Sequence, residues 1–252
     1  MKLTIYFLLA SLLTIACERS ILIEPGPIEE HDINKIEKGF VKGKVVDSQN
    51  KPIANAKIVA NSLDYEDAII SYSDNKGNYR IKLPTGIASG SFYVRGSVKM
   101  KFNGQEYFLA LFTENDGQFS PYDGAIKNLR LKITGKRTGN FGDDGFYGGT
   151  LEMHHDFDTI EKENIELTLI PDGTLVDGST GQTLVRRFAA DDYRIYDIPI
   201  GKYKITAKDV SNGKKLKVKI RYDEKDYSES TTGVFLPPYE LAEHYEMTLL
   251  VK

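Results

Sequence analysis

Short strand-like runs separated by turn residues constrain the fold of this chain more than any other feature. Between positions 40 and 133, apolar or alternating runs recur about every ten residues, a spacing typical of all-β domains. The runs are FVKGKVVD, AKIVAN, AIISYS, YRIKL, SFYVRGSV, EYFLALF and LRLKI. No long stretch has the apolar stripe of an amphipathic helix, which repeats about every 3.6 residues. About seven short strands with regular turns predict an all-β sandwich.

Composition and one turn dipeptide agree with this prediction. The chain has 15 Tyr, 12 Phe and 22 Gly, together with many Val, Ile and Thr in short runs. Aromatic and β-branched residues favour strands, and glycine favours tight turns. Asn103-Gly104 separates the runs VRGSVKMKF and EYFLALF. Because Asn-Gly tolerates the positive φ angles of a two-residue turn, these two runs are predicted to form a hairpin.

Two segments of the first half resemble the carboxypeptidase regulatory-like domain, a transthyretin-like sandwich found in many bacterial surface proteins. The segments are GKVVDSQNKPIANAKI and SDNKGNYRIKLPTG. The positions that carry the resemblance are Gly43, Asp47, Pro52, Ala56, Asp74, Gly77 and Tyr79, with Asn50 and Ser73 as substitutions of similar chemistry. The resemblance implies a fold and no peptidase activity.

Each of these positions is expected to have a structural role. We expect Asp47 and Asp74 to accept hydrogen bonds from loop amides, as Asp does in turns. Gly77 is expected to allow a turn, and Asn50 to adopt the left-handed conformation that asparagine tolerates. Tyr79 is expected to begin a strand with a buried ring.

A second unit of similar type is predicted from about Phe146. The run YRIYDIPIGKYKI, which starts at Tyr193, echoes the run YRIKLPTG, which starts at Tyr79. This weak internal repeat predicts two tandem sandwiches, transthyretin-like or Ig-like, over residues 39–135 and 146–252. The glycine-rich segment TGKRTGNFGDDGFYGG, residues 134–149, is the predicted seam.

The N-terminus has the layout of a bacterial export signal. Lys2 is followed by a mostly apolar run over residues 3–15, then Ala16 and Cys17. The run is shorter than the ~20 residues that a membrane-spanning helix requires, which favours cleavage. The sequence TIAC resembles the lipobox of bacterial lipoproteins, although Thr14 stands where an aliphatic residue is usual. The resemblance implies a signal peptide over residues 1–16 and lipid attachment at Cys17.

Cys17 is the only cysteine, so its lipidation leaves no thiol for a disulfide, a metal cluster or a nucleophile. Residues 17–38 mix acids with prolines and lack periodicity, which predicts a flexible tether. By resemblance, Glu18 differs from the Asp that retains lipoproteins in the inner membrane. We therefore expect a cell-envelope protein at the outer membrane, whose partners are the membrane itself and an envelope protein, glycan or peptide.

Two groups of residues are candidate metal sites. HHDFD, which begins at His154, combines imidazoles and carboxylates, and His155 with Asp158 is similar to the His-x-x-Glu pair of zinc carboxypeptidases. A third ligand would have to be His244 or a distant carboxylate, so we favour an exposed strand end. The acidic turn DDG, which begins at Asp143, suits calcium chemically but lacks the graded spacing of known loops, so we favour a solvated turn.

Two other groups are candidate binding surfaces. GKYKITAK and KKLKVKIR alternate, which predicts one basic sheet face if they pair through Asn212-Gly213. Its members are Lys202, Lys204, Lys215, Lys217, Lys219 and Arg221. Such a face suits an anionic glycan, lipopolysaccharide or a phosphate backbone, or it serves solubility and discourages edge pairing. The aromatic residues Phe119, Tyr122, Phe146 and Tyr147 are candidates for stacking on sugars.

The sequence contains no convergent catalytic group. There is no nucleophile elbow and no glycine-rich phosphate loop, and the net charge of −3 does not indicate nucleic-acid binding. We expect no catalytic residue, no cofactor and no metal. The leading hypothesis is a non-catalytic envelope lipoprotein that serves as a structural or interaction module. The alternatives are a glycan- or peptide-binding accessory lipoprotein of an outer-membrane uptake system and, third, a metal-dependent hydrolase.

Overall fold

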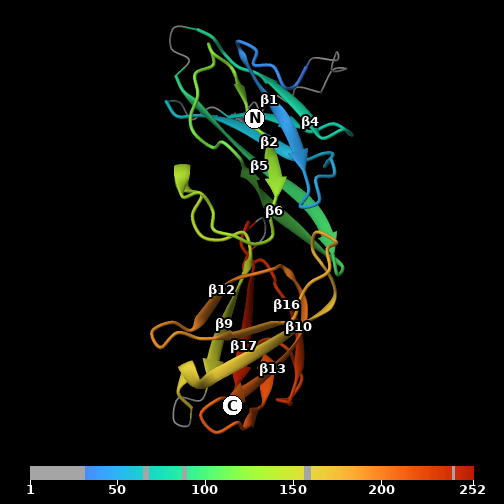
Figure 1. The fold of residues 1–252 in the computed structure, drawn as a ribbon, viewed down its shortest axis with the longest axis vertical. Coiled ribbons are helices and arrows are strands. Elements are labelled where there is room, and N and C mark those ends of the chain that lie inside the picture. The colour runs from blue at the N-terminus through green and yellow to red at the C-terminus, as the bar shows by residue number, and fades with distance from the viewer. Residues whose placement is uncertain (1–31, 65–67, 87–89, 156–159, 240–241) are drawn as a thin grey trace, which may run out of the picture.

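The computed structural model describes residues 32–252 except 65–67, 87–89, 156–159 and 240–241. The fold class is the predicted one: the described residues form β-sheets in sandwich-like arrangements (Figure 1). Helical structure there is confined to two 3-10 turns, Asn140–Gly142 and Lys162–Asn164. No helix in the described part is long and apolar enough to cross a membrane.

The strands fall into two lobes, one at each end of the molecule in Figure 1. The N-terminal lobe contains one eight-stranded sheet, in the order β3-β2-β5-β6-β8-β1-β4, with β7 also paired to β1. Its strands are β1 (Phe40–Val46), β2 (Lys57–Ser62), β3 (Ala68–Tyr72), β4 (Asn78–Lys82), β5 (Phe92–Phe102), β6 (Gln105–Thr113), β7 (Ala125–Ile126) and β8 (Leu129–Leu131).

The first strand, β1, joins the two layers of this sandwich-like sheet, because its two parts pair with different strands. The first part of β1 pairs antiparallel with β4, and its last residues, Val45 and Val46, pair in parallel with β8. The apolar residues Val41 and Val45 of β1 are fully buried. Gly43 between them lies against β7, where an added Cβ would come within 2.1 Å of the Lys127 carbonyl oxygen. The close approach of the two strands therefore requires glycine at this position.

The turn roles predicted for the first half are confirmed. Oδ1 of Asp47 accepts hydrogen bonds from the amides of Gln49 and Lys51, each at 2.8 Å. Oδ1 of Asp74 does the same for two amides on its C-terminal side, also at 2.8 Å. Asn50 has a φ of 65°, as its left-handed role requires.

The predicted hairpin and buried ring are also present. Asn103 and Gly104 have φ angles of 50° and 79°, and they join β5 to β6 in the two-residue turn. The ring of Tyr79 is buried, and its hydroxyl donates a hydrogen bond to the Lys127 carbonyl at 2.5 Å. This hydrogen bond links β4 to the segment that follows β7, on the other edge of β1.

The last residues of the predicted tether contact the lobe. The carboxylate of Glu37 accepts hydrogen bonds from the guanidinium of Arg80 and from Nζ of Lys42. These contacts hold the pKa of Glu37 at about 2, against an ordinary value of 4.5, chiefly through the Arg80 hydrogen bond. The amide of Gly39 also donates to the Pro121 carbonyl at 2.8 Å. The chain therefore joins the fold before residue 39.

The C-terminal lobe contains two facing sheets. One has the order β11-β10-β13-β14 with β16 also paired to β13, and the other has the order β12-β9-β17-β15. The strands are β9 (Gly149–His155), β10 (Ile165–Leu175), β11 (Leu184–Arg187), β12 (Arg194–Ile198), β13 (Gly201–Asp209), β14 (Lys215–Leu216), β15 (Val218–Ile220), β16 (Thr231–Val234) and β17 (Glu246–Val251).

Both lobes use the same arrangement around their first strand. In the N-terminal lobe β1 lies between β4, which is antiparallel, and β8, which is parallel. In the C-terminal lobe β9 lies between β12, which is antiparallel, and β17, which is parallel. The two YRI runs of the sequence repeat fall at equivalent strands, β4 and β12. The rings differ, because Tyr79 is buried and Tyr193 is 37% exposed.

Candidate binding cleft at the junction of the lobes

The predicted seam, residues 134–149, is fixed to both lobes by hydrogen bonds. The carboxylate of Asp197 accepts hydrogen bonds from the amide of Gly135 at 2.7 Å and from the amide of Gly148 at 3.2 Å. Asp197 itself has a φ of 62°, a conformation rare outside glycine. One side chain of the C-terminal lobe therefore holds both ends of the seam.

Two tyrosine hydroxyls join the lobes directly. Tyr107 on β6 donates to the Phe235 carbonyl at 2.8 Å, and the hydroxyl of Tyr245 lies 2.6 Å from the amide and 3.1 Å from the carbonyl of Phe108. The two tyrosine rings pack together with centroids 4.9 Å apart. Burial raises the pKa of each to about 12, so both hydroxyls remain protonated near neutral pH. The buried apolar residues form one cluster that includes members of both lobes.

A largely buried arginine organises the seam. Arg137 donates to a carboxylate oxygen of Asp143 at 3.1 Å, to the Glu243 carbonyl at 2.8 Å and to the Phe146 carbonyl at 3.3 Å. The other carboxylate oxygen of Asp143 accepts from the Thr138 hydroxyl at 3.4 Å. The predicted solvated turn is therefore wrong for Asp143, whose carboxylate is the acceptor of an internal ion pair with Arg137. Among the described residues, no group of three His, Cys, Asp or Glu side chains is placed to hold a metal ion.

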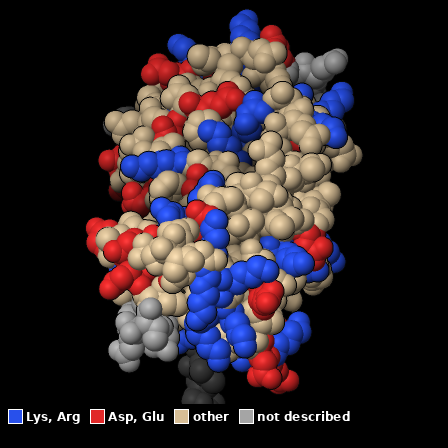
Figure 2. Space-filling model, turned by 60° about the horizontal axis from the view of Figure 1, so that its bottom comes forward, with Lys and Arg blue, Asp and Glu red and all other residues tan. Residues whose placement is uncertain are grey.

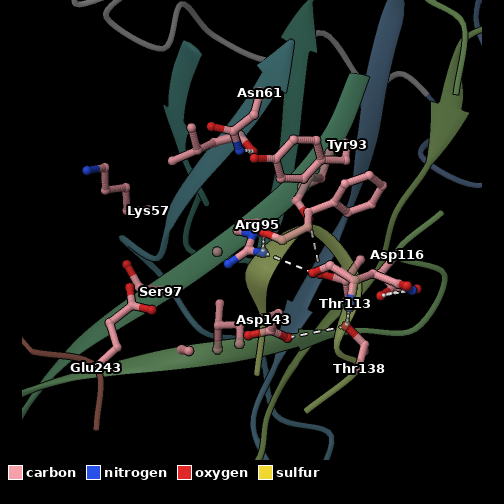
Figure 3. Close-up of a pocket in the computed structure, with 17 residues that line it drawn as sticks. Lys57, Asn61, Tyr93, Arg95, Ser97, Thr113, Asp116, Thr138, Asp143 and Glu243 are labelled. Carbon is pink, nitrogen blue, oxygen red and sulfur yellow. Dashed lines mark hydrogen bonds between the residues drawn. The ribbon is translucent and has the colours of Figure 1, made fainter. Parts of the chain in front are cut away.

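A cleft of about 220 Å³ lies between the seam and the face of β2, β5 and β6. Figure 3 shows that its side chains come from both lobes and the seam. Lys57, Ser97 and Glu243 lie at one end of the view, and Asp116 and Thr138 lie at the other.

Aromatic stacking and a guanidinium shape the seam wall of the cleft. Phe141 in the first 3-10 turn stacks on Tyr93 of β5, with ring centroids 4.2 Å apart and an angle of 12° between the planes. Arg95, two residues further along β5, donates to the carbonyl of Asn140 at 3.1 Å and to the carbonyl of Phe141. The same strand therefore holds both the ring and the backbone of this turn.

The polar end of the cleft is anchored by Asp116 and Lys127. The Asp116 carboxylate accepts a hydrogen bond from the Asn140 side-chain amide at 2.8 Å. Burial raises the pKa of Asp116, but hydrogen bonds from Thr138 and Asn140 outweigh it and lower the pKa overall. Nζ of Lys127 donates to the Asn115 and Gly117 carbonyls at 2.7 Å each, which fixes the loop that carries Asp116. Burial lowers the pKa of Lys127.

The cleft has the chemistry of a binding site. Its lining includes two cations, Lys57 and Arg95, and the carboxylates of Asp116, Asp143 and Glu243. Arg137 lies 3.1 Å from the Asp143 carboxylate and 3.9 Å from the Glu243 carboxylate, so the charges around the cleft are close to balanced. Its lining residues include hydrogen-bond donors and acceptors and one exposed aromatic ring, but no histidine or cysteine. The arrangement can bind and orient a polar molecule.

The aromatic residues singled out in the sequence lie elsewhere. Phe119 packs on Phe92 with centroids 6.5 Å apart, and Tyr122 donates its hydroxyl to the Gly86 carbonyl. Phe146 stacks on Tyr196, and the ring of Tyr147 is buried. The exposed ring of the cleft, Phe141, stands in the same glycine-rich seam and was missed. Its signal is an aromatic residue flanked by the two glycines Gly139 and Gly142.

The candidate zinc residues are not brought together in the described part. His154 and His155 end β9, where Nε2 of His154 lies 3.3 Å from an Arg221 nitrogen. Asp158, like Cys17, lies outside the described residues. His244 precedes β17, whose first residue pairs with Thr150. Thr150 is four residues from His154 along β9, which is about 13 Å at strand rise. His244 is therefore too distant to be the third ligand.

The single basic face predicted from the lysine alternation is wrong. β14 pairs with β13 as expected, but β15 belongs to the opposite sheet and pairs with β17. Lys202, Lys204 and Lys215 therefore lie on one sheet, while Lys217 and Lys219 follow the chain to the other.

Carboxylates also lie close to some of these lysines and offset their positive charge. Lys202 pairs with Asp172 at 2.6 Å, and Lys215 lies 3.6 Å from Glu229. Figure 2 shows Asp and Glu side chains beside the Lys and Arg side chains of this end of the molecule. The predicted lysines are therefore divided between two sheets, and the Lys and Arg side chains gathered near the lower end of Figure 2 have Asp and Glu side chains at their edges.

Comparison with known proteins identifies no family. No family model matches the chain, and no curated protein matches it. Solved structures with some similarity include the Bacillus anthracis TIE protein (15% identity, TM-score 0.31, 85% of this chain and 33% of that one). A streptococcal ancillary pilin has 10% identity and a TM-score of 0.26, with 83% of this chain and 61% of that one covered.

A third similar structure is the major pilin T-13 of Streptococcus pyogenes. It has 13% identity and a TM-score of 0.26, with 86% of this chain and 97% of that one covered. This chain spans only a third of the TIE protein and about three fifths of the ancillary pilin. The likeness to these proteins is one of fold class alone.

Proposed function

We propose that this chain is a non-catalytic lipoprotein of the bacterial cell envelope that serves as a structural and interaction module. The observation that carries the proposal is in the sequence: the only cysteine, Cys17, directly follows a small residue at the end of a short apolar run. In this proposal the lipid on Cys17 anchors the protein at the outer membrane. The acidic residues that follow form a tether, and the folded part meets its partner away from the bilayer.

The folded part supports a module of this kind. The carboxypeptidase regulatory-like resemblance covers residues 43–86 of the first lobe, and the second lobe repeats the arrangement of strands around the first strand. Hydrogen bonds of Tyr107, Tyr245 and Asp197 couple the lobes and the seam, so a partner bound at one lobe is held in a defined orientation to the other. The cleft favours a second candidate within the same class, a glycan- or peptide-binding accessory of an uptake system.

Intact mass and membrane fractionation test the proposal. Wild-type protein expressed in a Gram-negative host is expected to carry acyl mass and to sediment with membranes, because more than one acyl chain is needed for stable anchoring. Cys17→Ser is expected to lose both properties. A matched control, Cys17→Ser with Ser20→Cys, keeps one thiol but moves it out of the lipobox, and it is expected to remain without acyl mass. Acyl-free, soluble wild-type protein would overturn the proposal.

A further inference from the structure

Phe141 occupies a backbone conformation that its residue type disfavours. Its φ and ψ are 50° and 33°, in the left-handed region. For a bulky residue this conformation is a rare outlier, and it is strained. Gly139 and Gly142 on either side also have positive φ, at 77° and 76°. A third glycine would remove the strain, but it would also remove the ring that stacks on Tyr93 and lines the cleft.

Neighbouring side chains fix the position of the Phe141 ring and leave part of it exposed to solvent. Arg95 donates hydrogen bonds to the carbonyls of residues 140 and 141, and Tyr93 covers one face of the ring. The residue nevertheless remains 37% exposed and lines the cleft. The strained turn therefore presents one face of a rigid aromatic ring to a polar cleft.

The rest of the cleft excludes several classes of ligand. β2, β5 and β6 are each paired on both edges, so they offer no unpaired strand edge to which an extended peptide could add. Lys57 and Arg95 oppose Asp116 and Glu243, so neither a strongly anionic nor a strongly cationic ligand is favoured. The volume of about 220 Å³ is below the ~300–1,000 Å³ of pockets that enclose drug-sized molecules. The occupant is a small, neutral, polar group.

We propose that the cleft binds one neutral sugar ring of a glycan, stacked on the open face of Phe141. A pyranose has an apolar face of C–H groups that packs on an aromatic ring, and its hydroxyls both donate and accept hydrogen bonds. Asn61, which pairs with Tyr93 across the strands, supplies a donor and an acceptor near the stacked rings, and Arg95 supplies a donor. Ser97 lies four residues from Tyr93 along β5, about 13 Å at strand rise, so it and Glu243 are placed to contact the next sugar ring of the glycan. The inference rests on the proposed function as an interaction module and names the ligand class of that module.

Ligand-detected NMR and calorimetry on the full-length protein in detergent micelles test the inference. The probes are maltotriose, cellotriose and tri-N-acetylchitotriose as neutral glycans and trigalacturonate as an acidic one. At least one neutral trisaccharide is expected to bind. Loss of the ring in Phe141→Gly or Phe141→Asn is expected to weaken binding by about tenfold, the size of an aromatic contact. Phe141→Tyr keeps the ring and is expected to keep binding.

Matched controls separate the site from general effects. Phe141→Gly and Phe141→Asn both suit the left-handed conformation, so their unfolding midpoints are expected to equal or exceed that of the wild type. Tyr222→Ala removes an exposed ring outside the cleft and is expected to leave binding unchanged. Binding of trigalacturonate alone, no binding of any neutral probe, or unchanged binding in Phe141→Gly or Phe141→Asn would overturn the inference. A lipidated protein that binds no sugar would leave the proposed function standing, because fractionation does not depend on the cleft.

Discussion

The hydroxyl of Tyr107 is a direct test of how the two lobes are held. Tyr107→Phe removes one buried hydrogen bond to the Phe235 carbonyl and leaves the ring in place against Tyr245. A typical buried hydrogen bond contributes about 1 kcal/mol, and an acceptor left unpaired costs about 1–3 kcal/mol. Because the ring remains and no large cavity forms, we expect the free energy of unfolding to fall by about 1–2 kcal/mol. Urea denaturation measures this change.

Tyr203→Phe is the matched control. Its hydroxyl donates to the Pro199 carbonyl at 2.7 Å, and burial also raises its pKa to about 12. Both partners lie in the C-terminal lobe, so this substitution is expected to cost a similar free energy without affecting the junction. The comparison therefore separates stability from coupling of the lobes.

Spin labels on the two lobes measure the coupling. Labels at Lys76→Cys and Lys214→Cys, in a Cys17→Ser background, report the distribution of distances between exposed sites of different lobes. Tyr107→Phe combined with Tyr245→Phe is expected to broaden this distribution, and Tyr203→Phe is expected to leave it unchanged. Equal broadening in Tyr203→Phe, or none in the double variant, would refute the conclusion that these hydroxyls hold the lobes together.

Two further substitutions test an ion-pair cluster and a buried hydroxyl without a hydrogen-bond partner among the described residues. Glu37→Gln removes the ion pairs with Arg80 and Lys42. The pKa of Glu37 is about 2 in the folded protein, below its ordinary value of 4.5. The wild type therefore has the stabilisation from these ion pairs above about pH 4.5 and loses it as the pH falls towards 2. Its side chain is 31% exposed, so we expect a loss of about 1 kcal/mol at pH 7 that shrinks on acidification, and a pH-independent difference in urea midpoints would contradict this. Tyr147→Phe removes a buried hydroxyl with no hydrogen-bond partner among the described residues, so thermal unfolding is expected to show equal or higher stability, and a loss above about 1 kcal/mol would show that the hydroxyl is bonded.

The strands and turns of the first lobe could be predicted because their signals are local. Asp47 and Asp74 bond to amides within four residues, and Asn103-Gly104 fixes the register of the strands that it joins. Nothing comparable marks the contacts between the lobes. Tyr107 and Phe235 are 128 positions apart, and neither residue type nor spacing indicates that one hydroxyl meets the other carbonyl. The cleft is built from contacts of that kind, so it was not predicted.

The prediction of one basic face was wrong because the alternation of apolar and basic residues does not show where the chain passes from one sheet to the other. Leu216 and Val218 are both buried, as two successive inward residues of one strand would be. The chain nevertheless passes from β14 in one sheet to β15 in the other between them. Because both sheets face the same core, the apolar period continues through the crossing. The period therefore reports which side chains are buried but not which sheet carries them.

The seam shows how one short segment serves both the junction and the cleft. Its glycines supply the positive φ angles that let it turn tightly. Asp197 accepts hydrogen bonds from the backbone amides near its two ends, and the side chain of Arg137 within it donates to the carbonyls of Phe146 and Glu243. A glycine-rich segment without such contacts would be a flexible linker. Here the contacts fix the loop firmly enough to keep Phe141 in a strained conformation against Tyr93. The seam therefore links the placement of that ring to the junction of the lobes, and loosening the seam is expected to disturb both.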